Sequence, residues 1–239
     1  MAERPIFIPA LEGSVLVLTR PIEFHWHPGM AMVQKQKSID SLHAAAKAHG
    51  IGKALEVSSK SRSPLGVALS AFNLMITTAK YNRTFSVECA YQGSKVFEHG
   101  GPFVDMFEKA SRDAKRDERL RSSGRLMGFR FFGIDWSLEP QTAFYDWLYI
   151  NALKKQPELS EQVLQYSAFT DIEFNPERSL NCQAYSVALF VSLVRRKKLE
   201  EATSSRDAFL HTVNAAPVSN AREDETLQPR LRLQSYNHD

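Results

Sequence analysis

The chain has 239 residues, of which 43% are hydrophobic, 10% aromatic and 24% charged. This composition can bury a substantial core, so it excludes a wholly disordered chain, a collagen-like fibre and a coiled-coil rod. No run of about 18 apolar residues could span a bilayer, and no secretory signal opens the sequence. Two cysteines are too few for a disulfide framework. We therefore expect a cytoplasmic protein.

The net charge of +3 hides an uneven distribution. Residues 109–130 contain eight basic and three acidic side chains, which is a larger excess than that of the whole chain. One interpretation is a solvated helix face with internal ion pairs. The other is a surface that faces phosphates, as in nucleic-acid binding. Under the second interpretation the candidate DNA contacts are Arg112, Lys115, Arg116 and Arg119.

The first hundred residues alternate short extended and helical patterns. Pro21 should end one strand, Ser38 should cap a helix, and Gly50 should adopt the left-handed conformation that follows it. The predicted elements are strands at 14–19, 22–26 and 54–57, a polar loop at 58–63, and helices at 38–49 and 86–97.

The second half is predicted to be mostly helical. The predicted elements are helices at 103–121, 142–154, 157–166 and 180–198, a strand at 129–136 and an extended segment at 170–174. From residue 201 the periodicity is lost, which predicts a weakly structured tail with a short helix near 207–213. The balance favours a single α+β domain that is mainly helical, with a few short strands.

Four polar side chains share one face of the predicted helix at 86–97. Glu88, Tyr91, Gln92 and Lys95 follow the spacing i, i+3, i+4 and i+7. On an exposed face they would simply be solvated. In a polar pocket, a lysine with a lowered pKa can attack a carbonyl carbon, and a glutamate can act as acid or base.

Three further features carry weaker signals. The hydroxyls, Lys60 and backbone N–H groups of loop 58–63 could hold a phosphate, although the loop lacks a Walker pattern and is equally typical of a solvated turn. Trp136 follows an aromatic run and is either a core residue or a stacking platform. His25 and His27 lack the further ligands of a metal site, so we expect no metal.

The run at 86–97, SVECAYQGSKVF, resembles the signature helix of the NADAR family. Residues 69–74 are similar to the family's Ser-Asn-Phe segment, with Ser70 or Asn73 in the family's role. Residues 171–175 resemble its Asp-aromatic-Gly stretch. Here Phe174 replaces the family's tryptophan and Asn175 replaces its glycine. The supporting matches are Trp136, the hydroxyl-rich segment 58–61 and Asn181, which precedes the last long helix.

The resemblance implies a domain organisation. The NADAR-like catalytic core would cover residues 55–200. Residues 1–54 would form an extension that packs on this core, and residues 201–239 would form the tail. The whole chain is most similar to the antitoxin branch found beside DarT-type toxins.

In that branch the resemblance implies a glycohydrolase that removes ADP-ribose from guanine bases of DNA. Lys95, with Lys60 as the lesser candidate, would form a Schiff base with the opened ribose. Glu88 would bind the distal ribose or carry a proton, and Asp171 would orient the substrate. The implied ligand-binding residues are Ser58, Ser59, Lys60, Ser70, Asn73, Tyr91, Gln92, Trp136, Phe174 and Asn181.

The implied substrate is ADP-ribosylated guanosine in DNA, and the product is ADP-ribose. The cognate DarT-type toxin is a functional partner, and no cofactor or membrane is implied. Two alternatives remain open. One is a module that binds ADP-ribose or a nucleotide without turnover, or that neutralises the toxin by contact. The other is an N-glycosidase acting on a small phosphorylated metabolite.

Overall fold

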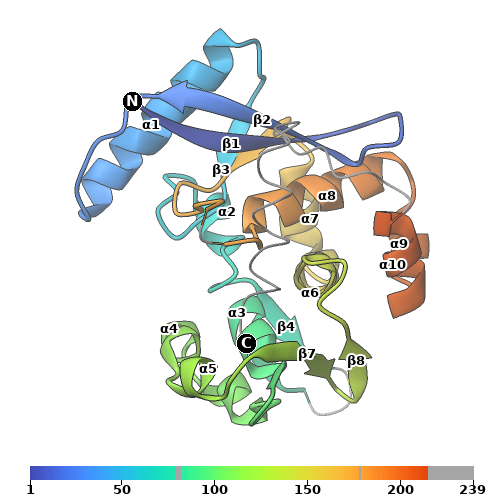
Figure 1. The fold of residues 1–239 in the computed structure, drawn as a ribbon. Helices are drawn as coiled ribbons and strands as arrows, with labels where there is room; N and C mark the ends of the chain where they lie inside the picture. Colours follow the sequence, from blue (N-terminus) through green and yellow to red (C-terminus); the bar gives the residue numbers. More distant parts are fainter. Residues whose placement is uncertain (79–81, 178, 215–239) are drawn as a thin grey trace, which may run out of the picture.

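The computed structural model describes residues 1–78, 82–177 and 179–214 (Figure 1). This part of the chain contains three small sheets and a set of mostly short helices, so the expected α+β class is confirmed. The strands are β1 (Ala2–Pro9), β2 (Val17–Phe24), β3 (Ala54–Glu56), β4 (Met75–Thr77), β5 (Thr84–Ser86), β6 (Lys95–Phe97), β7 (Leu126–Phe131), β8 (Ile134–Trp136) and β9 (Ala168–Thr170).

The helices lie between and after these strands. They are α1 (Met32–Ala48), α2 (Pro64–Ala68), α3 (Val87–Gly93), the 3-10 helix η1 (Val104–Glu108), α4 (Ser111–Arg116), α5 (Arg119–Ser122), α6 (Ala143–Lys154), α7 (Pro157–Val163), α8 (Gln183–Arg195), α9 (Leu199–Ala202) and α10 (Arg206–Asn214). None of the helices in the described ranges combines the length and apolarity needed to cross a bilayer.

The largest sheet has the strand order β2-β1-β9-β3. β1 and β2 form an antiparallel hairpin, and β1 meets β9 where Phe7 lies opposite Phe169. Successive residues of β1 point to opposite faces. Ile6 packs in the cluster under α1, whereas Phe7 belongs to the main core, which includes α6 and α8. Helices therefore cover both faces of this sheet.

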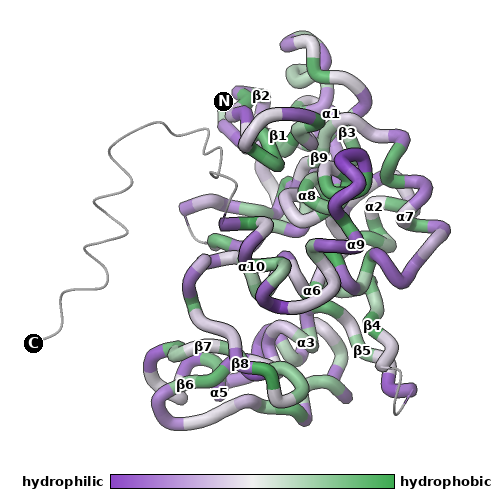
Figure 2. The backbone as a smooth tube through the Cα atoms, turned by 90° about the vertical axis from the view of Figure 1, so that its right-hand side faces the viewer, coloured by the Kyte–Doolittle hydropathy of each residue, from purple (hydrophilic) through white to green (hydrophobic). Residues whose placement is uncertain are grey.

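The remaining elements lie below this sheet in Figure 1. Figures 1 and 2 both show the four-stranded sheet and the strands β7 and β8 at opposite ends of the molecule, with α6 between them. Figure 2 also shows hydrophilic segments in peripheral turns. The interior side chains of α6 include the fully buried Tyr149 and Leu153. Helix α6 thus joins the two ends through one continuous core.

The loops that follow β3 and β9 leave the large sheet at the same edge. β3 and β9 are parallel, with Ala54 opposite Ala168, and the N–H of Val57 donates to the carbonyl of Thr170 at 2.8 Å. Because parallel strands end at the same edge, the loops that follow β3 and β9 emerge side by side. These are the loops at 58–63 and 171–175.

Two predicted boundaries in the N-terminal segment were wrong: the end of a strand at Pro21 and the start of a helix at Ser38. The strand β2 continues through Pro21. The strand β1 was not predicted. A proline is tolerated because β2 is an edge strand. The N–H groups on its outer side have no partner strand, so a residue without an N–H costs no hydrogen bond there. Helix α1 begins at Met32, and Ser38 is not its cap. Ser38 is instead buried within the helix, where its hydroxyl accepts from the N–H of His27 at 2.9 Å.

The long helix predicted at 103–121 is broken into η1, α4 and α5. Ala110 and Asp117 both have extended ψ angles of 143° and 128°. The carboxylate of Asp117 accepts from the backbone N–H of Arg119 at 3.0 Å, which is a local bond that competes with helix continuation. The predicted strand at 129–136 is likewise a hairpin, β7 and β8, because Phe132 and Gly133 turn with φ angles of 46° and 82°.

The predicted tail is structured at its beginning. Helix α10 coincides with the short helix expected near 207–213, and Phe209 on it is fully buried. The described chain is therefore folded up to residue 214, through the beginning of the segment that was predicted as a tail. The rest of the predicted tail, residues 215–239, lies outside the described residues.

Candidate active site

Helix α3 places two polar side chains in the interior. Ser86 caps the helix, its hydroxyl accepting from the N–H of Cys89 at 3.1 Å. The cap fixes the first turn, which carries Glu88. Gln92, one turn later, donates through Nε2 to Glu88 Oε1 at 2.9 Å. Both side chains are buried, so the exposed-face interpretation of this helix is wrong for them.

Lys95 does not belong to this helix, as predicted, but is the first residue of β6. Its ammonium nitrogen lies 4.9 Å from the centre of the Tyr91 ring, so the two side chains still meet. Burial, against the opposing charge of Glu88 and with a smaller contribution from the charge of Lys115, lowers the pKa of Lys95 to about 8. About a tenth of the amine is therefore uncharged at pH 7, far more than for an exposed lysine.

A second segment reaches this group from the N-terminal side of α8. Asn181 donates through Nδ2 to the hydroxyl oxygen of Tyr91 at 2.7 Å. Burial then raises the pKa of Tyr91 above its usual value. Two buried oxygens, Gln92 Oε1 and Asn181 Oδ1, have no hydrogen-bond partner among the described residues. An unpaired buried acceptor costs about 1–3 kcal/mol, so a ligand hydroxyl or N–H would find two prepared acceptors here.

Helix α4 contributes a cation to the same place. The ammonium nitrogen of Lys115 lies 3.8 Å from Glu88 Oε1 and 5.1 Å from the centre of the Phe72 ring. Its side chain remains more than half exposed. Lys115 therefore connects the interior carboxylate of Glu88 with the outer surface of α4.

The adjacent loops after β3 and β9 are joined by a buried carboxyl group, Glu56. It accepts from the hydroxyl of Ser58 at 2.6 Å, and from the hydroxyl of Thr170 at 2.6 Å. It also accepts from the N–H of Ile172 at 2.9 Å. Burial and the charge of Asp171 raise the pKa of Glu56, and these three donors only partly offset the rise.

Asp171 lies on the same buried edge. Burial raises its pKa to about 6, although the N–H of Glu173 donates to it at 3.0 Å and so favours the charged form. Gln183 also hydrogen-bonds to Asp171, and its Oε1 accepts from the N–H of Ala71 at 2.8 Å. Asp171 is thus held between the loop after β9 and the start of α8.

A family model described as the DarT1-associated NADAR antitoxin matches residues 2–223. The chain belongs to this family. The match includes the strands and helix of residues 2–54, which pack into the same structure as the core. It also confirms the resemblance found in the sequence. No curated protein matches the chain.

The NADAR signature run therefore folds as helix α3 followed by β6, and it brings Glu88, Tyr91, Gln92 and Lys95 together as the sequence predicted. The supporting segments are more dispersed. Ser58 is buried against Glu56, whereas Ser59 is exposed and Lys60 is half-buried, with its N–H donating to Ser58 at 3.2 Å. Ser70 is buried, and Asn73 is exposed with its amide on the carbonyl of Val67.

Of the two interpretations of Trp136, a core residue or a stacking platform, the structure agrees with the core residue. Only 4% of its surface is exposed, and its ring centre lies 5.1 Å from that of Trp147 and 5.5 Å from that of Phe144. The tryptophan of this NADAR chain is thus a core residue that holds β8 against α6. Phe174 is half-buried and meets Phe7 edge-on at 6.3 Å, so part of its ring remains open.

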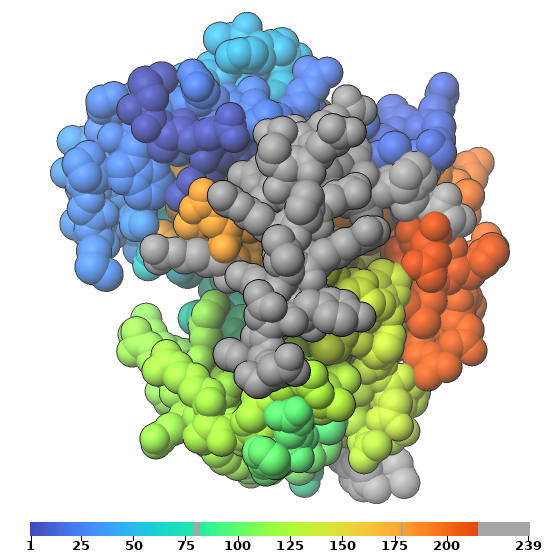
Figure 3. All heavy atoms as spheres, in the orientation of Figure 1, coloured from blue at the N-terminus to red at the C-terminus, as the bar shows by residue number. Residues whose placement is uncertain are grey.

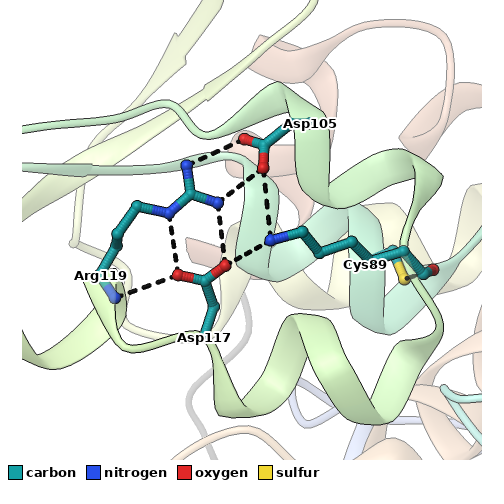
Figure 4. Close-up of polar contacts among 5 residues, drawn as sticks. Cys89, Asp105, Asp117 and Arg119 are labelled. Atoms are coloured by element: carbon teal, nitrogen blue, oxygen red, sulfur yellow. Dashed lines mark hydrogen bonds and ion pairs between the residues drawn. The ribbon is translucent and has the colours of Figure 1, made fainter.

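Arg119, one of the predicted DNA contacts, is paired with carboxylates in the structure. Its guanidinium group makes paired contacts to Asp105 and Asp117, and Lys109 bonds to Asp117 at 2.7 Å (Figure 4). Two carboxylates therefore neutralise two of the cations in the basic segment. Arg112 and Arg116 differ, because no carboxylate of the described residues pairs with them, and both are exposed.

The sequence analysis did not predict the contacts of two residues in the site. Glu56 was not proposed as a site residue, and Lys115 was proposed only as a DNA contact. Glu56 is a charged residue inside a predicted buried strand, a combination that signals a paired or hydrogen-bonded carboxyl. Lys115 gave no local signal, because only the fold brings α4 to Glu88. No group of three or more histidine, cysteine and carboxylate side chains within the described ranges could hold a metal ion. The rings of His25 and His27 lie 4.6 Å apart, centre to centre.

Proposed function

We propose that this NADAR antitoxin is a glycohydrolase that removes ADP-ribose from guanine bases of ADP-ribosylated DNA, and that it acts in the cytoplasm against a DarT-type toxin. The membership of the DarT1-associated family supports the antitoxin role. The observation that carries the chemical proposal is the half-buried Lys95 amine, whose lowered pKa leaves it partly neutral beside Glu88.

The proposed reaction passes through a Schiff base. The neutral amine of Lys95 attacks the ribose carbon that carries guanine, in the ring-opened imine form of the sugar. The bond from that carbon to guanine breaks, and the base nitrogen takes a proton. Water then adds to the imine on Lys95, which releases ADP-ribose and restores the amine. Glu88 is the group that we assign to these proton transfers.

The remaining candidate residues are assigned to binding. In the proposal Asn181 and Gln92 receive hydroxyl or N–H groups of the ligand through their unpaired oxygens. The loop at 58–60 supplies N–H and hydroxyl groups and the cation of Lys60 to the diphosphate. Asp171 and the open edge of Phe174 orient the remainder of the substrate.

The direct test uses a guanine-ADP-ribosylated oligonucleotide and borohydride. Wild-type protein should release ADP-ribose, and borohydride should trap a covalent adduct that maps to Lys95. The substitutions Lys95→Ala and Glu88→Gln should each lower the rate by at least a hundredfold without unfolding the protein. Lys155→Ala, on the exposed end of α6, is the matched lysine control. Full activity of both site variants would refute the mechanism.

The unpaired acceptors also suit a protein that binds ADP-ribose without turnover, which is the second candidate function. In that case the wild-type protein would bind ADP-ribose, as calorimetry would show, yet release no product from the modified oligonucleotide. If release occurred only from a small phosphorylated nucleoside, the protein would instead be a metabolite N-glycosidase.

A further inference from the structure

An apolar tip stands at the beginning of α1. Met30 is 95% exposed, Val33 58% and Met32 45%, and no other described segment as short exposes three large apolar side chains. We call Met30, Met32 and Val33 the apolar tip. Other large apolar side chains are exposed singly or in pairs, as Leu11 is, so the clustering of three here suggests a surface that meets a partner.

Ion pairs place the tip beside the candidate active site. Lys35, one turn after Met32, pairs with Glu173 at 3.0 Å, and Glu173 is two residues beyond Asp171. Further along α1, Asp40 pairs at 2.8 Å with Arg62, in the loop that follows β3. Helix α1 therefore lies over both loops of the sheet edge, with its apolar first turn at one end.

The opposite side of the site is bordered by α4. Lys115 on α4 reaches Glu88 in the interior. Figure 3 shows a hollow between the beginning of α1, in blue, and α4, in green. The beginning of α1, which carries the apolar tip, and α4, which carries Arg112, Lys115 and Arg116, thus form the two rims of one hollow.

The charges around this hollow favour an anionic partner. Residues 25–39 contain no aspartate or glutamate, and they include the exposed Lys37 as well as Lys35, whose charge is paired with Glu173. On the other rim, Arg112 and Arg116 have no carboxylate partner in the described part of the chain. A partner that offers negative charge and flat apolar groups together matches these rims, and a nucleic-acid strand with unstacked bases offers both.

We propose that a DNA strand crosses this hollow, with its phosphates on Arg112 and Arg116 and with the base next to the modified guanine against the apolar tip. This inference rests on the proposed function, because it concerns the DNA part of the same substrate. Methionine is flexible and polarizable, so it adapts to the faces of different bases. Apolar side chains inserted beside a base also keep it unstacked, which presents the modified guanine to the site.

The test compares a Met30→Ser/Val33→Ser double variant with Leu11→Ser. Leu11 is 56% exposed in the β1–β2 turn and provides the same chemical change away from the hollow. Two quantities are measured for each protein: the affinity for an unmodified fluorescent single-stranded oligonucleotide, and kcat/KM on a modified oligonucleotide and on ADP-ribosyl-guanosine. Melting temperatures confirm that all variants are folded.

The tip variant should bind the oligonucleotide about tenfold more weakly, the order expected for one lost stacking contact. It should lose a similar factor in kcat/KM on the oligonucleotide and retain activity on the nucleoside, while Leu11→Ser should behave as wild type. Unchanged oligonucleotide affinity would overturn the inference, as would equal losses on both substrates. If the tip variant kept its DNA affinity but no longer co-purified with the toxin, the partner would be a protein.

The affinity measurement separates this inference from the proposed function. If wild-type protein hydrolysed neither substrate, the glycohydrolase proposal would fail. A weaker affinity of the tip variant for DNA would still support the contact, and an equal affinity would still contradict it.

Discussion

At the scale of single residues, the environment of Lys95 decides what its amine can do. Burial and the cation of Lys115 both disfavour the ammonium form, and Glu88 favours it. The same lysine on an open helix face would be charged at neutral pH and would be a poor nucleophile. The tertiary neighbours thus turn an ordinary side chain into a candidate reactive group.

The first prediction follows from this pKa. Because the neutral amine is the reactive form, the rate of the chemical step should rise with pH and level off above about 8. Lys115→Met removes a cation that lowers the pKa of Lys95, so the rise should move to higher pH. Single-turnover rates at saturating substrate measure this profile. Arg121→Gln, an exposed change on α5, should leave it unchanged, and an unshifted Lys115→Met profile would contradict the assignment.

At the scale of elements, the basic segment divides into two parts with different roles. Arg119, the first residue of α5, and Lys109, just after η1, are neutralised by the carboxylates of Asp105 and Asp117 (Figure 4). Helix α4 exposes Arg112 and Arg116 without carboxylate partners among the described residues. The excess of positive charge counted at 109–130 is therefore real. Which of these cations can bind an anion depends on where the predicted helix is broken into η1, α4 and α5.

The second prediction tests this division by salt dependence. Each phosphate contact on single-stranded DNA contributes about 0.7 to the slope of log affinity against log salt concentration. Arg112→Gln/Arg116→Gln should weaken oligonucleotide binding and reduce the slope by about 1.4. Arg119→Gln should leave the slope unchanged, because its guanidinium group is already paired. Equal slopes for all three proteins would show that α4 does not contact DNA.

At the scale of the whole molecule, buried carboxyl groups couple stability to pH. Burial raises the pKa of Glu56, the pKa of Asp146 to about 7 and that of Asp171 to about 6. A folded state with raised carboxyl pKa values binds more protons than the unfolded state at pH 5 to 8. The free energy of unfolding should therefore fall as the pH rises through this window.

The third prediction isolates the part of Glu56. Glu56→Gln removes its titration and retains a carbonyl for the N–H of Ile172, so the fall in stability between pH 5 and 8 should become shallower. Glu56→Ala leaves that N–H and two buried hydroxyls without their partner, which should cost about 3 kcal/mol at pH 6. Urea unfolding at several pH values measures both effects. A slope unchanged by Glu56→Gln would mean that this carboxyl is ionised in the folded protein throughout.

Local patterns were reliable where one short-range interaction fixes the backbone. Ser86 caps α3, and Gly50 has the predicted positive φ of 74° after α1. The strand at 54–57 and the helix at 142–154 were also found, because their apolar periodicities are strong. The helix at 103–121 failed because its charged periodicity concealed the competing bond of Asp117 to the backbone.

By itself the sequence determined the family, the α+β class and the polar group Glu88, Tyr91, Gln92 and Lys95, because these depend on residues close together in the chain. Tertiary structure decided which distant groups join them. It brings Asn181 to Tyr91, Lys115 to Glu88, and Glu56 to the loop after β9. It also buries Trp136 and neutralises Arg119. Burial and charge pairing depend on contacts between segments far apart in the chain, so no local pattern encodes them.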